Sequence, residues 1–356
     1  MNDTVAFDET RGALAILDQT LLPAREEIIY LTKPDDIHSA IYNLQVRGAP
    51  AIGVAAAIGL YLAAQSIVDK MSAPGDFDKF LALFKAAKNK LNSARPTAVN
   101  LSWALERMER TALKHQMEPL GTIVERLKAE CLSIYQMDAQ VCGAIGREGL
   151  SLLAPGMGLL THCNAGRLAT ASKYGTATAP IYLGYERGYN FTVYCGETRP
   201  LLQGARLTAY ELCSTGIDAT LICDNMVSSL MSAGRVDAVL VGCDRVAANG
   251  DTANKIGTSY IAIAARYYGI PFYVCAPAST VDFSCSDGRA IEIEQRPADE
   301  VTNMWFENRI APEGVKVYNP SFDLTDASLI TAIVTEHGIA RPPYNDSLAG
   351  LIRDKR

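Results

Sequence analysis

The chain has 356 residues, of which 49% are hydrophobic and 20% charged, and its formal net charge is −6 with a pI near 5.4. This composition is typical of a globular protein that is long enough for two domains. The net negative charge disfavours nucleic acid or an anionic membrane surface as the main partner. Because the first residues lack the basic and apolar regions of a signal peptide, we expect a cytoplasmic protein.

The N-terminal part has a mainly helical pattern after two short apolar runs that indicate strands, at residues 13–17 and 26–31. Apolar residues then recur at spacings of three and four, with Gly and Pro between the segments. The segments expected to be helical are residues 37–46, 51–65, 77–93, 101–115 and 120–148. The most apolar stretch, residues 49–64, contains Gly53 and Gly59 and is short for a membrane span, so a buried helix is expected.

The pattern changes near residue 157, where short apolar runs begin to alternate with helical segments. The expected strands are residues 159–162, 191–195, 219–223, 238–242 and 272–276, and the expected helices are residues 168–187, 205–215 and 254–268. Alternation of this kind predicts an α/β fold with a parallel sheet covered on both faces, which binds ligands beyond the carboxyl ends of its strands. We therefore predict a helical domain with a small sheet over residues 1–125 and a parallel-sheet domain over residues 126–356, joined within a helix.

The cysteine and histidine content argues against several kinds of site. The nine cysteines are an odd number without a CxxC pair, and several stand beside apolar runs, which indicates reduced thiols rather than a disulfide framework or a zinc site. Four histidines without metal-ligand spacing disfavour a metalloenzyme. The chain has no GxGxxG string after a strand, no Walker loop, no HExxH and no GxSxG, so a dinucleotide cofactor is not indicated.

Cys163 directly follows the first expected strand of the parallel sheet, in the string LTHCNAG. A thiol at such a strand end can be activated by a helix N-terminus or a nearby cation. The alternative is a buried structural cysteine, as most of the nine cysteines must be. His162 lies one residue earlier, where the side chain is expected to point the other way, and we interpret it as structural.

Asp244 follows another apolar run in the string VLVGCDR. A carboxyl group in a dry environment can serve as a general acid. The alternative is an ordinary helix cap or an ion pair with Arg245. Two strand ends of one sheet, one with a thiol and one with a carboxyl group, favour a pair of groups that transfer protons.

Two helix starts carry residues suited to phosphate or sugar hydroxyls. Arg47, Gly48 and Ala49 precede the long apolar helix, and Asn254 and Lys255 stand where another helix is expected to begin. The alternatives are a plain turn and an ordinary cap beside a solvated lysine. Weaker polar clusters at the ends of elements contain Arg95, Gln203 and the string ETRP at residues 197–200.

Seven strings in order resemble the methylthioribose-1-phosphate isomerases, over nearly the whole chain from about Leu17 to Ile339. The strings are RGAPAIG, RPTAVNL, THCNAG, ETRPLLQGARLTAYEL, GCDRVAANGDTANKIGTSY, PFYVCAP with STVD, and IEIEQRP. The wider superfamily includes ribose-1,5-bisphosphate isomerases and regulatory subunits of a eukaryotic translation initiation exchange factor.

The resemblance implies a helical N-terminal domain with a small antiparallel sheet, a Rossmann-like C-terminal domain and a homodimer, with no cofactor or metal. It implies that Cys163 and Asp244 are catalytic. By the same resemblance the substrate site is lined by Arg47, Gly48, Ala49, Arg95, Gln203, Asn254 and Lys255. Two positions depart from the family pattern, Cys243 where Ala is usual before the catalytic Asp, and Gly196 before the ETRP string.

The function expected from this resemblance is conversion of S-methyl-5-thioribose 1-phosphate to the corresponding ketose phosphate in methionine salvage. Three alternatives stay open. A paralogous group acts on 5-deoxyribose 1-phosphate, a second related group acts on ribose 1,5-bisphosphate, and the regulatory subunits are not enzymes. The bisphosphate would need a second cationic cluster, whereas a methylthio or methyl group needs an apolar pocket.

Overall fold

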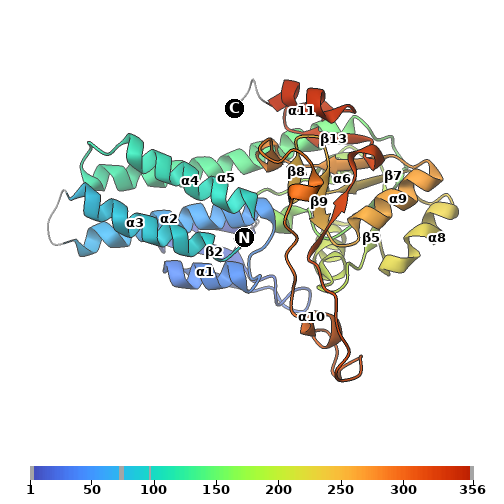
Figure 1. Ribbon diagram of the computed structural model, residues 1–356, viewed down its shortest axis with the longest axis horizontal. Helices are drawn as coiled ribbons and strands as arrows, with labels where there is room; N and C mark the ends of the chain where they lie inside the picture. Colours follow the sequence, from blue (N-terminus) through green and yellow to red (C-terminus); the bar gives the residue numbers. More distant parts are fainter. Residues whose placement is uncertain (1–3, 72–75, 96–97, 353–356) are drawn as a thin grey trace. The chain divides into compact units, whose positions relative to one another are not determined.

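The computed structural model describes residues 4–71, 76–95 and 98–352 (Figure 1). The chain divides into two compact units, unit 1 with residues 1–141 and 167–175, and unit 2 with residues 142–166 and 176–356. The division falls within the long helix α5 (Leu120–Leu150), as does the division that we predict at residue 125.

Unit 1 begins with a three-stranded antiparallel sheet in the order β1-β2-β3. Its strands are β1 (Val5–Asp8), β2 (Ala13–Leu17) and β3 (Ile28–Leu31). The second and third strands confirm the prediction. Strand β1 was not predicted, because its three apolar residues stand alone between the polar stretches NDT and DETR.

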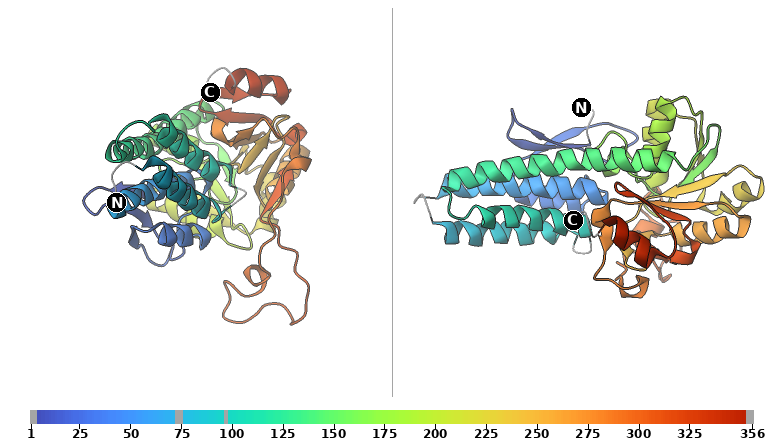
Figure 2. Two further views of the ribbon diagram at one scale, coloured as in Figure 1. Left: turned by 60° about the vertical axis from the view of Figure 1, so that its left-hand side comes forward. Right: turned by 90° about the horizontal axis from the view of Figure 1, so that it is seen from above.

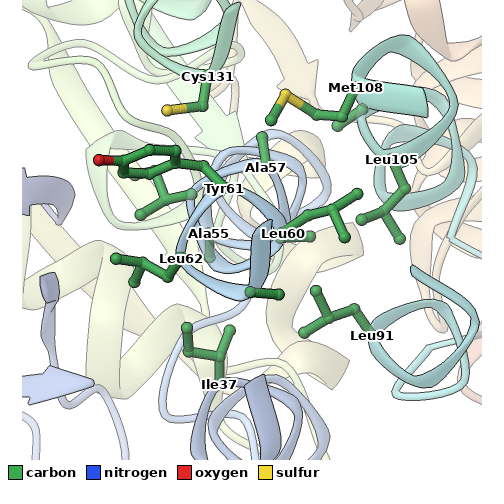
Figure 3. Packing of buried hydrophobic residues seen from close by; sticks show 14 of the residues in the cluster. Ile37, Ala55, Ala57, Leu60, Tyr61, Leu62, Leu91, Leu105, Met108 and Cys131 are labelled. Atoms are coloured by element: carbon green, nitrogen blue, oxygen red, sulfur yellow. The ribbon is translucent and has the colours of Figure 1, made fainter. Parts of the chain in front are cut away.

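The five helical segments predicted in the N-terminal part are all present. They are α1 (Pro34–Tyr42), α2 (Ala49–Lys70), α3 (Phe77–Asn92), α4 (Val99–Lys114) and α5. Every residue of α2 from Ala51 to Ala64 is buried. Figure 3 shows Leu60, Tyr61 and Leu62 of α2 surrounded by Ile37, Leu91, Leu105, Met108 and Cys131 from the other four helices.

Helix α2 is long and apolar enough to cross a membrane by length and composition alone. However, 78% of its most apolar window is buried inside the structure. This burial is typical of the central helix of a packed core, and it confirms the prediction of a buried helix at this position.

Unit 2 contains a seven-stranded sheet in the order β14-β13-β10-β7-β4-β5-β6. Its strands are β4 (Gly158–Thr161), β5 (Thr192–Gly196), β6 (Ala219–Ile222), β7 (Ala238–Val241), β10 (Phe272–Cys275), β13 (Ala332–Thr335) and β14 (Gly338–Ala340). All neighbours are parallel except β14, which is antiparallel to β13. The five predicted strands are confirmed, and the strand order reverses direction between β4 and β7, as in doubly wound α/β folds.

Three helices pack their apolar side chains against one face of this sheet. They are α8 (Val227–Ser232), α9 (Thr258–Tyr268) and α11 (Tyr344–Ile352), which share one buried cluster with side chains of β4, β7, β10 and β13. The end of α5 packs closely against α6 (Ala179–Glu186), since a Cβ added at Gly149 would lie 2.5 Å from Pro180.

A second, four-stranded sheet in the order β11-β8-β9-β12 was not predicted. Its strands are β8 (Arg245–Ala247), β9 (Thr252–Lys255), β11 (Val281–Asp282) and β12 (Phe322–Thr325). All four have only two to four residues beside polar loops and therefore give no clear periodicity. Between β11 and β12 the chain forms an arm that carries α10 (Asp299–Thr302) and extends away from the sheets of unit 2 (Figure 2).

The placement of Asn254 and Lys255 at a helix start is wrong, because both lie in β9 and α9 begins only at Thr258. Asn254 pairs with Asp323 of β12, whose carboxylate accepts hydrogen bonds from the N–H groups of Gly257 (2.8 Å) and Ser259 (3.1 Å). This carboxylate fixes the first turn of α9 two residues after the strand.

The helix predicted over residues 168–187 is only partly present. The structure has a short 3₁₀ turn (Arg167–Ala169) and α6, with turns between them. Glycine, serine and threonine between these two pieces favour turns, a signal that the apolar spacing concealed. The helix predicted over residues 205–215 is confirmed, with a π-helical turn (Gly204–Thr208) that leads directly into α7 (Ala209–Thr215).

Candidate functional site

The carboxyl ends of β4 and β7 lie side by side at the point where the strand order reverses. The two strands are parallel neighbours, with Leu160 beside Val239. A Cβ added at Gly242, just after β7, would lie 2.5 Å from the Cβ of Ala165 in the loop after β4. The loops that carry Cys163 and Asp244 therefore touch, at the place where doubly wound sheets bind ligands.

Cys163 has an unusual backbone conformation, with φ at +60°. Its N–H donates to Oγ1 of Thr198 (2.9 Å), and its carbonyl accepts from Oγ1 of Thr208 (2.6 Å). The residue is only partly buried, unlike Cys195 and Cys275 in the strands of the sheet. Its exposure thus separates it from the structural cysteines in the core.

Asp244 stands between β7 and β8 and is also partly buried. Its backbone N–H donates to the carbonyl of Ala253 in β9 (3.0 Å), which places Asp244 beside the strand that carries Asn254 and Lys255. The guanidinium of Arg245 lies 3.6 Å from the carboxylate of Asp282 and forms an ion pair with it.

Asn254 and Lys255 are each only 6% exposed. The amide of Asn254 donates to Oγ1 of Thr258 (3.0 Å), and this hydroxyl donates to the carbonyl of Lys255 (2.6 Å). A lysine is rarely buried to this extent unless its charge is paired. The strand thus brings an amide and an ammonium group to the same edge of unit 2 as Asp244.

His162 connects the loop of Cys163 to the end of β9. Its Nε2 lies 2.8 Å from the carbonyl oxygen of Ile256, and a Cβ at Gly257 would come within 2.9 Å of the same nitrogen. Burial lowers the pKa of His162, which favours a neutral ring that donates from Nε2 to Ile256. The buried, hydrogen-bonded ring agrees with our interpretation of His162 as structural.

Gln203 stands at the start of the π-helical turn and is 8% exposed. Among the described residues its Oε1 has no hydrogen-bond partner, although this atom is buried. A buried acceptor without a protein partner is a candidate contact for a donor on a ligand, such as a sugar hydroxyl. The next residue, Gly204, allows close packing, because a Cβ there would lie 1.7 Å from the carbonyl oxygen of Gly196.

The other four predicted site residues belong to unit 1. Gly48 caps the N-terminus of α2 with φ at +92°, and a Cβ there would lie 2.4 Å from the Cα of Ala169. The close approach that Gly48 permits is therefore made by the chain's own backbone at Ala169. Arg47, Ala49 and Arg95 are partly buried, and residues 96–97 of the RPTAVNL string lie outside the described residues.

Three residues near Cys163 were not predicted as site residues. Thr198 and Thr208 form hydrogen bonds with the backbone of Cys163, and Asp224 accepts the backbone N–H of Thr198. Thr198 lies in the ETRP cluster at the end of β5, a position that carried a weak signal. Thr208 lies in a segment of helical spacing, where a buried threonine gives no signal of its own.

Asp138 of α5 supplies a pH-dependent contact within unit 1. It accepts a hydrogen bond from the N–H of Ala171 (2.6 Å), and burial raises its pKa to about 7. Because the pKa of Asp138 is higher in the folded state than in the unfolded state, ionisation of this carboxyl group lowers the free energy of unfolding. The loss is absent below about pH 4, grows as the pH rises to 7, and levels off above that at roughly 4 kcal/mol.

We therefore expect Asp138→Asn to raise the free energy of unfolding relative to the wild type, and to do so more at pH 8 than at pH 5. Chemical denaturation of both proteins at the two pH values measures this difference. Asp78→Asn, at an exposed position, controls for the loss of one negative charge. An equal difference at both pH values would contradict the prediction.

Comparison with known proteins places these features in a family. Residues 45–342 match the model of the initiation factor 2 subunit family. A protein of Symbiobacterium thermophilum named methylthioribose-1-phosphate isomerase is 62% identical over 353 residues, which cover 99% of this chain and 97% of that protein. A protein of Petrotoga mobilis named 5-deoxyribose 1-phosphate isomerase is 55% identical, with 98% of each chain covered.

The crystal structure of 5-methylthioribose 1-phosphate isomerase from Pyrococcus horikoshii OT3 superposes with a TM-score of 0.91 at 39% identity, covering 100% of this chain and 97% of that one. The helical part with a small antiparallel sheet and the larger, mostly parallel sheet thus agree with a known fold. The chain belongs to the initiation factor 2 subunit family.

Proposed function

We propose that this chain is an aldose–ketose isomerase that converts S-methyl-5-thioribose 1-phosphate into S-methyl-5-thioribulose 1-phosphate in methionine salvage. The observation that carries the proposal is the pairing of Cys163 and Asp244 on touching loops at the reversal point of the sheet. The substrate is inferred from the names of the relatives that are 62% and 39% identical to this chain.

This substrate poses a specific chemical problem. Its anomeric oxygen carries the phosphate, so the furanose ring cannot open as a free sugar does. An acid must protonate the ring oxygen while the bond between C1 and that oxygen breaks. We assign this role to Asp244, whose backbone is held against Ala253 at the edge of the site.

A hydrogen must then move from C2 to C1, and two routes are open. In the first, Cys163 as a thiolate removes the C2 proton, and the thiol so formed returns this proton to C1 of the resulting enol, which restores the thiolate. In the second, the C2 hydrogen moves to C1 as a hydride while the thiol stabilises the cation. In both routes the C2 hydroxyl loses its proton, which restores the acid, so the reaction needs no external oxidant or reductant.

Substrate binding is proposed for the remaining residues. The orphaned Oε1 of Gln203 suits a sugar hydroxyl, and Lys255 with the Asn254 amide suits the phosphate. Arg47, Gly48, Ala49 and Arg95 are proposed as substrate-binding residues from the family resemblance. A Rossmann-like sheet domain, a homodimer, a cytoplasmic location and activity without cofactor or metal are proposed on the same ground.

The chief alternative is 5-deoxyribose 1-phosphate, because the Petrotoga relative with that name is 55% identical. The two substrates share the C1–C2 chemistry and differ at C5 alone. Both could use the same acid and thiol, so the distinction rests on the pocket around C5 rather than on Cys163 or Asp244.

A comparison of three substrates tests the proposal. The purified protein is incubated with 5-methylthioribose 1-phosphate, 5-deoxyribose 1-phosphate and ribose 1,5-bisphosphate in turn, and kcat/KM for ketose formation is measured by NMR. We expect the highest value for the methylthio sugar. A higher value for the deoxy sugar would identify the chain as a 5-deoxyribose 1-phosphate isomerase. Activity on the bisphosphate alone would contradict the proposed substrate.

A further inference from the structure

We infer that Thr198 and Thr208 are positioning residues that hold the backbone of Cys163 in its left-handed conformation, and so aim the thiol. The inference rests on the proposed function, in which the thiol of Cys163 acts on the substrate. Both threonines are fully buried, and each forms a hydrogen bond with the backbone of Cys163.

The conformation of Cys163 needs support. A φ of +60° is unfavourable for a residue with a Cβ, and it persists only where the surroundings enforce it. The Thr198 hydroxyl accepts the N–H of Cys163, and the Thr208 hydroxyl donates to its carbonyl. Both peptide groups that flank the Cα are therefore fixed by side-chain hydroxyls.

Thr198 is itself held in a strained position, with φ at +67°. The carboxylate of Asp224 accepts the N–H groups of both Thr198 (2.8 Å) and Arg199 (2.7 Å). The Thr198 hydroxyl also donates to the carbonyl of Gly196 (3.0 Å). The proton of this hydroxyl is thus engaged, and a lone pair of its oxygen accepts the N–H of Cys163. A β-branched residue is rarely found at positive φ, and here the two hydrogen bonds to Asp224 hold the backbone of Thr198 in this conformation.

Thr208 joins Cys163 to the turn that carries Gln203. It closes the π-helical turn (Gly204–Thr208), and its hydroxyl also accepts the side-chain amide of Asn164 (3.0 Å). Such turns are frequently found at functional sites. One buried hydroxyl thus fixes the thiol relative to the orphaned acceptor of Gln203.

Isosteric replacement separates the hydroxyl from the side-chain volume. We expect Thr198→Val and Thr208→Val each to lower kcat by about 10- to 100-fold with little change in KM, since a 1 Å misplacement at a reacting group can cost about 100-fold. Thr198→Ser and Thr208→Ser keep the hydroxyl and should restore most of the lost kcat.

Thr335→Val is the matched control. Thr335 is a fully buried threonine of the same sheet, and its hydroxyl likewise accepts an N–H, from His337 (3.1 Å), and donates to a carbonyl, of Gly338 (3.1 Å). Its replacement should leave kcat unchanged, because it does not contact the loop of Cys163. A comparable loss of kcat in Thr335→Val would indicate general destabilisation and overturn the inference.

A second readout is independent of turnover. The rate of alkylation of Cys163 by iodoacetamide in the folded protein is measured by mass spectrometry against the exposed Cys213 as internal reference. We expect the ratio and its pH profile to change in the valine variants and to return towards wild type in the serine variants. If the wild type isomerises none of the sugars, the proposed function is wrong. The alkylation ratio then still tests whether the two threonines position Cys163.

Asp224→Asn covers the case in which a valine variant fails to fold. The Asp224 side chain is 21% exposed, so its replacement is better tolerated, and it weakens the support of Thr198 without touching Cys163. A fall in kcat and an altered alkylation ratio would support the inference. Unchanged kcat and alkylation in the folded variants would overturn it.

Discussion

Asp244→Asn is expected to lower turnover by about 100- to 10,000-fold, the usual contribution of a general acid, while the protein remains folded. The amide has nearly the shape of the carboxyl group but cannot protonate the ring oxygen. The Asp244 backbone N–H, which donates to Ala253, is unaffected by the change. Steady-state assays with the methylthio sugar, together with thermal unfolding, measure the effect.

The matched control for this variant is Asp237→Asn. Asp237 precedes the same strand at its opposite, amino end, where its carboxylate accepts the N–H of Gly158 (2.7 Å). Turnover should be nearly normal, because this end of the sheet is remote from the carboxyl edge. Near-normal turnover in Asp244→Asn would remove Asp244 from the mechanism.

Cys163→Ser is expected to lower turnover by about 100-fold or more, since a hydroxyl is a much weaker base and a less polarizable group than a thiolate. The partly buried position and the backbone hydrogen bonds to the two threonines accommodate serine without a cavity. Circular dichroism and thermal unfolding should therefore match the wild type while turnover falls.

Cys213→Ser removes an exposed thiol of the same unit and should leave turnover unchanged. This comparison separates a specific role of Cys163 from a general effect of thiol loss. If Cys163→Ser keeps most of the activity, neither proton transfer by the thiol nor stabilisation of a cation can be part of the reaction.

The sequence predicted five of the seven strands of the larger sheet together with their ends, because buried parallel strands give short apolar runs bounded by turn residues, whereas β13 and β14 were not predicted. The strands β4 and β7 were found within a residue of their ends, and these ends direct attention to Cys163 and Asp244. The helices of unit 1 were equally clear, since Gly or Pro stands at their boundaries and each carries an apolar stripe, apart from α2, which is apolar on all sides.

Other features depend on contacts that no local pattern records. Asn254 and Lys255 read as a helix start, but pairing with β12 more than 60 residues later makes that segment a strand. Gly48 reads as an opening for a ligand, yet the backbone of Ala169 lies against it. The roles inferred for Thr198 and Thr208 depend on left-handed backbone conformations that residue type does not predict.

The isomerase activity is tested most directly by an NMR time course of the wild-type protein with 5-methylthioribose 1-phosphate and no added cofactor. We expect a ketose carbonyl signal to grow as the anomeric signal of the aldose declines, while the phosphate ester stays intact. Loss of the aldose with release of inorganic phosphate, or no ketose at any enzyme concentration, would contradict the proposed activity.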